Sequence, residues 1–306
     1  MGERAMGELT MAELTMAGDA TAGDAAAGGA VSSPAPASPS ALGSPSALSF
    51  TAYVPEPGPG EAPFVPAFPC FEYGAEEVDH LRSRDPKLGE VIDRVGHIYR
   101  PVIPDLFEAL IHAVVAQQIS SRALATIWGR MHERFAPLTP GRLAGLAPED
   151  VQRCGMTLRK AGYIVDIASR VASGTLDLDP VRIASLSDEE VCAELVELPG
   201  IGTWTAEMLL TFSLQRPNVM SYGDLAILRG LRMVYHHRVI TPELFARYKR
   251  RYSPYATTAS LYLWAIAGGA LPDMRDYAPK KPKPMTKAKM EGKAAGAKPK
   301  AAAARR

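Results

Sequence analysis

The chain has 306 residues, of which 47% are hydrophobic, and its formal net charge at pH 7 is only +1. Its three cysteines lie far apart and form no C-x-x-C pair, which argues against a structural zinc site, an iron–sulfur cluster and a disulfide framework. We see no apolar run long enough to span a membrane and no secretory or mitochondrial leader, so we expect a cytoplasmic protein.

The charges are unevenly distributed along the chain. Residues 1–62 are rich in Ala, Gly, Ser and Pro and carry seven acids against one arginine, which predicts a disordered acidic arm. Residues 279–306 carry eight lysines and two arginines against one glutamate, which predicts a disordered basic tail. Such a tail attracts phosphates without reading sequence, although it could also serve solubility alone. Residues 63–278 remain as the folded domain.

Helical periodicity dominates this domain. The predicted helices cover residues 104–117, 121–135, 157–173, 187–198, 203–214, 224–236, 242–252 and 256–268. Residues 99–104 are extended, but their two prolines indicate a connector rather than a strand. We find no convincing pair of strands, so the pattern predicts an all-α domain of about ten helices.

A glycine-rich turn joins two of these helices, in the sequence LPGIGTWTA (198–206). Gly200 and Gly202 allow a sharp turn and a close approach to a ligand. Ile201 would pack inward, and the next helix would start at Thr203, so that its unpaired N–H groups face the same space. These features predict a phosphate site, with an ordinary tight helix connection as the alternative.

A second motif, SYGDLAI, follows 15 residues after the turn and contains Asp224. This aspartate precedes an apolar helical run. Taken alone, its simplest role is to cap the N-terminus of that helix.

The two motifs occur in the order found in helix-hairpin-helix base excision DNA glycosylases, which the chain resembles over most of residues 70–270. Three further segments resemble the 3-methyladenine DNA glycosylase II branch: AVVAQQISSRAL (113–124), LRKAGYIVDIA (158–168) and YSPYATTASLYLW (252–264). The resemblance implies a two-lobed helical HhH-GPD domain. Residues 1–62 do not match the mixed-sheet domain that precedes it in longer members, so the chain is similar to the short form.

The resemblance implies a site without metal or cofactor, in a monomer that binds double-stranded DNA containing alkylated bases. The hairpin would hold a phosphate while the damaged nucleotide is flipped into a pocket. Asp224 would stabilise the oxocarbenium-like sugar and orient the attacking water.

Trp204 stands where bifunctional members of the superfamily carry a nucleophilic lysine, so a monofunctional enzyme is expected. Its indole would stack on cationic purines such as 3-methyladenine and 7-methylguanine. Trp264, at the second pocket-tryptophan position of the branch, and Tyr222 would complete the base pocket, whereas core packing is the alternative for both tryptophans. Gln118 stands where some members insert an apolar wedge into the duplex gap, with a buried or capping role as its alternative.

Two other functions compete with an alkylbase glycosylase. A non-catalytic module that binds DNA lesions would use the same hairpin, but it would not need a carboxylate facing DNA. An adenine or thymine mismatch glycosylase is disfavoured because the chain has no four-cysteine cluster.

Overall fold

The computed structural model describes residues 66–279, so the acidic arm and nearly all of the basic tail lie outside the described residues. Within this range the chain forms helices and an isolated bridge between Cys70 and Pro101, with no strand. This confirms the all-α prediction. None of the helices in residues 66–279 is long and apolar enough to cross a bilayer.

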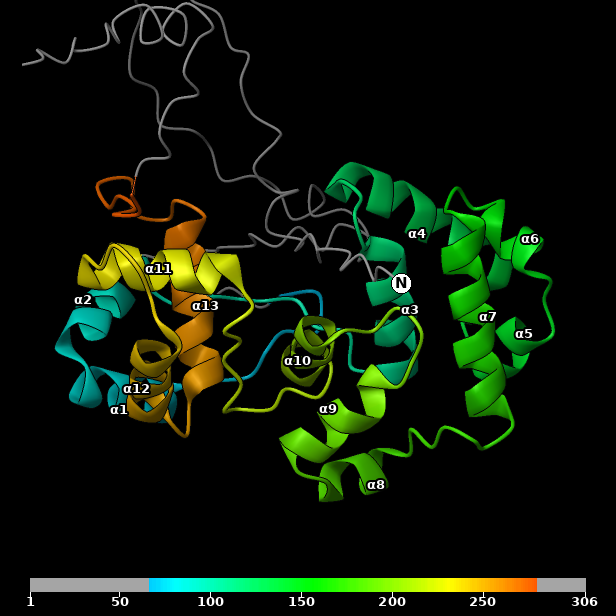
Figure 1. Cartoon of the computed structure of the whole chain (residues 1–306), viewed down its shortest axis with the longest axis horizontal. Helices are drawn as coiled ribbons and strands as arrows, with labels where there is room; N and C mark the ends of the chain where they lie inside the picture. The colour runs from blue at the N-terminus through cyan, green and yellow to red at the C-terminus, as the bar shows by residue number, and fades with distance from the viewer. Residues whose placement is uncertain (1–65, 280–306) are drawn as a thin grey trace, which may run out of the picture.

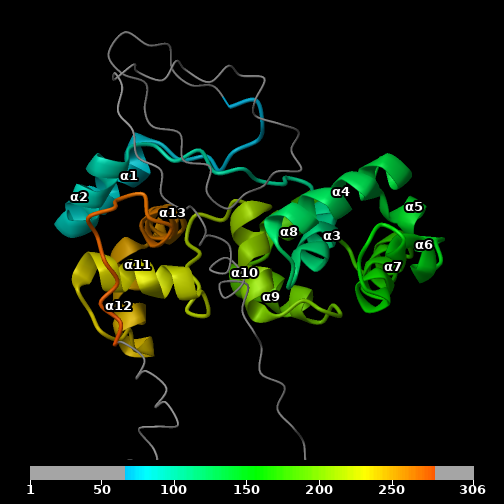
Figure 2. The same cartoon turned by 90° about the horizontal axis from the view of Figure 1, so that it is seen from above.

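The helices form two lobes, which lie side by side in both views (Figures 1 and 2). The lobe that holds both ends of the described chain, here called the terminal lobe, contains α1 (Ala75–Arg84), α2 (Pro86–Val95), α11 (Leu225–Tyr235), α12 (Pro242–Tyr252) and α13 (Ala256–Ala267). The other, the central lobe, contains α3 (Leu106–Ala116), α4 (Ser121–Phe135), α5 (Pro140–Ala144), α6 (Pro148–Gln152), α7 (Leu158–Ala172), α8 (Pro180–Ser185), α9 (Asp188–Val196) and α10 (Thr203–Phe212).

Each lobe has its own hydrophobic core. In the central lobe the core is centred on α3, in which Leu110, Ile111 and Val114 are fully buried. In the terminal lobe, α11 crosses α13 so closely that Gly230 faces the backbone of Leu263. Helix α10 belongs to the central core but lies next to the terminal lobe in Figures 1 and 2, so residues on this helix can contact both lobes.

The sequence predicts the long helices well. The bounds of α4 and α12 match the prediction, and Ser120 caps α4 by accepting a hydrogen bond from the Ala123 amide at 3.3 Å. Five helices were not predicted: α1, α2, α5, α6 and α8. The last three have only five or six residues, too few to show a helical period.

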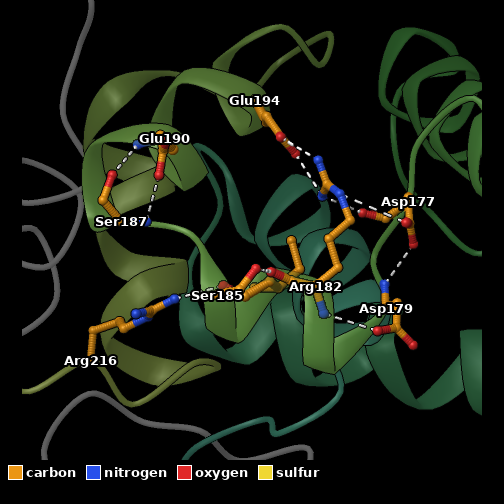
Figure 3. Close-up of polar contacts among 9 residues, drawn as sticks. Asp177, Asp179, Arg182, Ser185, Ser187, Glu190, Glu194 and Arg216 are labelled. Carbon is orange, nitrogen blue, oxygen red and sulfur yellow. Dashed lines mark hydrogen bonds and ion pairs between the residues drawn. The ribbon is translucent and has the colours of Figure 1, made fainter.

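A polar cluster fixes the segment that leads to the glycine-rich turn (Figure 3). Arg182 on α8 forms an ion pair with Glu194 on α9, and the Arg216 guanidinium donates to the carbonyls of Ile183 and Leu186. Ser187 and Glu190 form the capping box that begins α9. The ion pair therefore holds α9 to α8, and Arg216 in turn holds the C-terminal end of α8, before the chain enters the turn.

Candidate active site

A cavity of about 100 Å³ lies between α3, α10 and the extended connector that precedes α3. Its walls are mostly apolar, with an aromatic residue at each end of α10. The lining residues are Arg100, Pro101, Ile103, Ala109, His112, Ala113, Ala116, Gln117, Trp204, Thr205, Met208, Leu209 and Phe212. A largely apolar cavity with a few polar groups is the usual form of a small-molecule or base pocket.

Asp224 is joined to this cavity through Trp204. The Asp224 carboxylate is buried, and its Oδ1 accepts hydrogen bonds from the amides of Ala226 and Ile227, both at 2.9 Å. Its Oδ2 accepts a hydrogen bond from Trp204 Nε1 at 3.0 Å. Asp224 is thus the N-cap of α11, and its second oxygen reaches across to the central lobe.

Trp204 is the second residue of α10 and links the two lobes through its hydrogen bond to Asp224. Its indole lines the cavity, while its N–H group holds Asp224. The loop before α11 packs on the same ring, since a Cβ atom at Gly223 would lie 4.0 Å from two Trp204 atoms. The sequence placed Trp204 beside the pocket, but the hydrogen bond to Asp224 was not predicted.

The turn at residues 198–203 has the expected helix–turn–helix form. Gly200 adopts φ +84°, and a Cβ atom there would lie 2.7 Å from the Tyr163 ring, so only glycine fits without strain. Gly202 has ordinary extended backbone and is the N-cap of α10 without a side-chain cap. Ile201 is buried, as predicted, and Thr203 is exposed. The first amides of α10 therefore have no side-chain acceptor at the N-cap.

The loop that follows α3 is attached to this turn. Gln117 Nε2 donates to the Gly200 carbonyl at 2.6 Å. The Lys160 ammonium donates to the carbonyls of Val115 and Gln117, and its burial lowers the pKa of Lys160. Gln118, the next residue, is exposed and has φ +53°, so its side chain leaves the helix at a sharp bend next to the hairpin.

Two of the predicted pocket residues do not line the cavity. Trp264 on α13 packs behind a wall residue, with its ring 5.3 Å from that of Phe212. Tyr222 is 42% exposed; its hydroxyl donates to the Ile240 carbonyl at 3.4 Å, and its ring contacts Phe245. Trp264 thus contacts a wall residue of the cavity, whereas Tyr222 contacts residues of the terminal lobe. Their roles in the base pocket stay predictions.

Four polar residues of the cavity were not predicted: Arg100, His112, Gln117 and Thr205. The ring of His112 packs edge-on against Trp128 at 4.9 Å, and burial, with a smaller effect of His132, lowers the pKa of His112 to about 4. His112 is therefore neutral at pH 7. Arg100 lies in the connector, and the two prolines there predicted an extended segment but not that this segment would line a pocket.

Comparison with known proteins identifies the family to which the chain is similar. The model of the HhH-GPD superfamily base excision DNA repair proteins matches residues 111–254. The chain is 32% identical over 195 residues to DNA-3-methyladenine glycosylase 1 of Schizosaccharomyces pombe, covering 60% of this chain and 84% of that protein.

Two solved structures are similar over nearly their whole length. The DNA-3-methyladenine glycosidase of Bacillus halodurans is 32% identical, with a TM-score of 0.60, and the match covers 66% of this chain and 94% of that one. The Schizosaccharomyces pombe 3-methyladenine DNA glycosylase Mag1, solved in complex with abasic DNA, is 30% identical with a TM-score of 0.55, over 63% and 97% of the two chains. The chain belongs to the HhH-GPD superfamily of base excision DNA repair proteins.

Proposed function

We propose that the chain is a monofunctional DNA glycosylase that flips alkylated purines such as 3-methyladenine and 7-methylguanine out of double-stranded DNA and hydrolyses their N-glycosidic bond. The observation that carries this proposal is the hydrogen bond between Trp204 and Asp224, because it joins a base-sized aromatic wall to a carboxylate. The names of the relatives support the same substrate class.

Asp224 would act on the sugar while the base occupies the cavity. As the glycosidic bond breaks, positive charge develops on the sugar, and a fixed carboxylate stabilises that charge more strongly in the transition state than in the substrate. Three donors hold the Asp224 carboxylate in one orientation, so it would not need to reorganise during the reaction. Its second role would be to orient the attacking water.

We expect no lyase chemistry, because Trp204 offers no amine where the bifunctional members have lysine. Lys160 is the nearest alternative along the chain, but its ammonium donates to two backbone carbonyls at the end of α3. A lysine held in this way is a poor candidate for Schiff-base formation with the sugar.

DNA binding would use the hairpin and the adjoining loop. The first amides of α10 would hold a backbone phosphate, while Gln118 would fill the gap left by the flipped nucleotide. The hydrogen bond from Gln117 to the Gly200 carbonyl fixes the distance between the loop after α3 and the hairpin. This contact supports the proposal that the loop and the hairpin bind DNA together. Both contacts can be made by a single copy of the chain, so we expect a monomer.

The experiment is base release from duplex DNA under single-turnover conditions, using the full chain. The wild type should release 7-methylguanine from methylated duplex and leave an intact abasic strand that breaks only after alkali. Asp224→Asn should abolish release, and asparagine also caps helices, so the variant should remain folded. Borohydride should trap no covalent complex with the abasic product.

Three outcomes would contradict the proposal in different ways. Undiminished release by Asp224→Asn would remove the carboxylate from the mechanism. Strand breakage without alkali, or borohydride trapping, would show a lyase. Tight binding of alkylated duplex by the wild type without release would instead identify a non-catalytic lesion-binding module.

A further inference from the structure

Gln118 has a backbone conformation that residues other than glycine rarely adopt. Its φ is +53°, in the left-handed region. Helix α3 ends two residues earlier, and Gln117 has already left the helical conformation, with φ −57° and ψ 130°. Unfavourable backbone conformations persist only where surrounding contacts hold them, and they are frequent at functional sites. The contacts around Gln118 therefore show what maintains this bend.

The Lys160 ammonium holds the peptide group that precedes Gln118. From the first turn of α7 it donates to the Gln117 carbonyl, and also to the Val115 carbonyl at 3.0 Å. The Gln117 carbonyl and the Gln118 amide belong to one rigid peptide plane. Because Lys160 fixes one edge of this plane, it restricts rotation about the N–Cα bond of Gln118, and that rotation is φ.

Helix α7 also supports the hairpin. Tyr163, three residues after Lys160, packs its ring against Gly200 so closely that a Cβ atom there would lie 2.7 Å away. The Gly200 carbonyl in turn accepts the hydrogen bond from the Gln117 side chain at 2.6 Å. One helix thus sets the position of the loop and of the hairpin relative to each other.

Capping of α3 explains only part of this arrangement. A lysine near the C-terminus of a helix commonly binds the last helical carbonyls, and the contact with Val115 is of that kind. The Gln117 carbonyl lies beyond Ala116, the last residue of α3. The second contact therefore stabilises the loop rather than the helix.

We propose that Lys160 is a positioning residue that presents Gln118 to the gap in the duplex and thereby favours the flipped state of the damaged nucleotide. This inference rests on the proposed glycosylase function. Without Lys160, the peptide before Gln118 is free to turn, and the side chain can leave the direction of the gap. The flipped nucleotide would then return to the stack more often, so that less of the bound complex is ready to react.

The test follows the gap and the chemistry separately, with the full chain. The first duplex contains tetrahydrofuran, an abasic-site analogue, opposite 2-aminopurine, whose fluorescence depends on its stacking. Insertion of a side chain beside 2-aminopurine changes this signal without any bond being broken. We expect a clear change on binding of the wild type and a markedly smaller one with Lys160→Met.

The second measurement is single-turnover release of 7-methylguanine at saturating enzyme. Lys160→Met should slow release by about tenfold, as for the loss of a hydrogen bond from a charged group. Its affinity for undamaged duplex should stay close to wild type, because the hairpin keeps its contact with Tyr163. Lys160→Arg retains the charge and the donors and should recover part of both signals.

A double-mutant cycle separates positioning from a structural role. If Lys160 acts through Gln118, Lys160→Met should slow release much less in the Gln118→Ala protein than in the wild type, because the side chain that it positions is already absent. Urea denaturation shows whether the variants are folded. If Lys160→Met is not, Lys160→Gln replaces it in the cycle, since glutamine keeps a donor but has a shorter reach.

Arg142→Met is the matched control. The Arg142 guanidinium donates to the carbonyl of Ala136, the residue that follows α4, at 2.5 Å. It therefore holds a helix end in the same way, but at the opposite end of α4 from the loop that contains Gln118. Arg142→Met should leave the fluorescence change and the release rate as they are in the wild type.

Three outcomes would contradict the two proposals separately. A wild-type fluorescence change and release rate in Lys160→Met would overturn the inference and leave the glycosylase function intact. Equal losses with and without the Gln118 side chain would also overturn it, because Lys160 would then act on the fold and not on Gln118. A wild type that gives the Lys160-dependent fluorescence change but releases no base would overturn the proposed function alone.

Discussion

Asp224 is the N-cap that its sequence context predicted, and its second carboxylate oxygen has a partner that the sequence did not predict. One carboxylate oxygen caps α11, and the other accepts the Trp204 N–H group. A capping carboxylate usually stabilises only the helix that it caps. In Asp224, the two amide hydrogen bonds to Oδ1 also fix the direction in which Oδ2 points. The pattern of local residues could predict the cap, but the partner on α10 is 20 positions away and depends on the packing of the two lobes.

The hydrogen bond from Trp204 can be removed while its aromatic surface is largely kept. Trp204→Phe deletes the indole N–H group that holds Asp224 Oδ2. We expect the single-turnover rate of 7-methylguanine release to fall by about tenfold or more, as for the loss of a hydrogen bond to a charged group. Affinity for a duplex containing an abasic site should remain close to wild type. A rate within twofold of wild type would contradict the positioning role of Trp204.

Gly200 is the residue of the hairpin whose backbone depends most on the absence of a side chain. Gly200→Ala would place a Cβ atom 2.7 Å from the Tyr163 ring at φ +84°. We expect a loss of about 1–2 kcal/mol in the free energy of unfolding from the backbone conformation alone. Affinity for undamaged duplex should fall as well, because the ring contact displaces the hairpin. Urea titration and fluorescence anisotropy measure the two effects.

Gly174→Ala is the control for that prediction. Gly174 has a similar φ of +75°, but a Cβ atom there has nothing within 4 Å. The Gly174→Ala variant should therefore lose stability only through its strained backbone conformation, and it should bind DNA with the affinity of the wild type. Equal DNA affinity in the two variants would show that the Tyr163 contact does not govern the hairpin.

At the scale of elements, the sequence predicted most of the long helices and missed the short ones, and it also missed the ten-residue helices α1 and α2. Helices of eleven or more residues repeat an apolar face several times, whereas α5 and α6 have too few residues to do so. The connector at residues 99–104 was correctly predicted to be extended. The sequence did not predict that this connector lines a cavity. The cavity forms only where the connector packs against α3 and α10, and the residues of the connector alone do not indicate that packing.

The crossing of α11 and α13 is the element contact on which Asp224 most depends. At Gly230 a Cβ atom would lie 2.5 Å from the Leu263 carbonyl oxygen and 2.9 Å from its Cα atom. Backbone atoms cannot rotate away, so Gly230→Ala must push the helices apart. We expect a loss of about 3 kcal/mol in the free energy of unfolding, at the upper end for overpacking, measured by urea denaturation. Base release should fall too, since α11 carries Asp224.

Gly129→Ala on α4 provides the comparison in a helix with open space around the glycine, where nothing lies within 4 Å of the added Cβ. There the change should be neutral or stabilise the fold by up to about 1 kcal/mol, the helix propensity difference between the two residues. Similar stability changes at the two positions would mean that the helix crossing tolerates a methyl group.

At the scale of the whole molecule, the terminal lobe is built from two segments that are more than one hundred residues apart in sequence. Local periodicity does not reveal such a pairing, and the two-lobed shape was expected only from the resemblance to a known family. Asp224 caps α11 of the terminal lobe, whereas its indole partner Trp204 belongs to α10 of the central lobe. Figure 1 shows these two helices on either side of the boundary between the lobes. The candidate site therefore depends on how the lobes pack, and each lobe alone would hold only half of it.

The charge distribution leads to the last prediction, which concerns DNA binding by the full chain. Residues 279–306 contain eight lysines and two arginines, while residues 1–62 are acidic. Each lysine or arginine that neutralises a phosphate adds about 0.9 to the slope of log affinity against log salt concentration. Deleting residues 279–306 should therefore reduce affinity for undamaged duplex and flatten that slope, with single-turnover release at saturating enzyme unchanged.

A full-length variant in which the eight tail lysines are replaced by glutamine separates charge from length. If the tail acts through phosphates, this variant should bind duplex with nearly the same shallow salt dependence as the deletion, because the two tail arginines are all that remains of the positive charge. Fluorescence anisotropy across a range of salt concentrations measures both slopes. An unchanged slope in the deletion would assign the tail to solubility and leave DNA affinity to the hairpin and the residues around it.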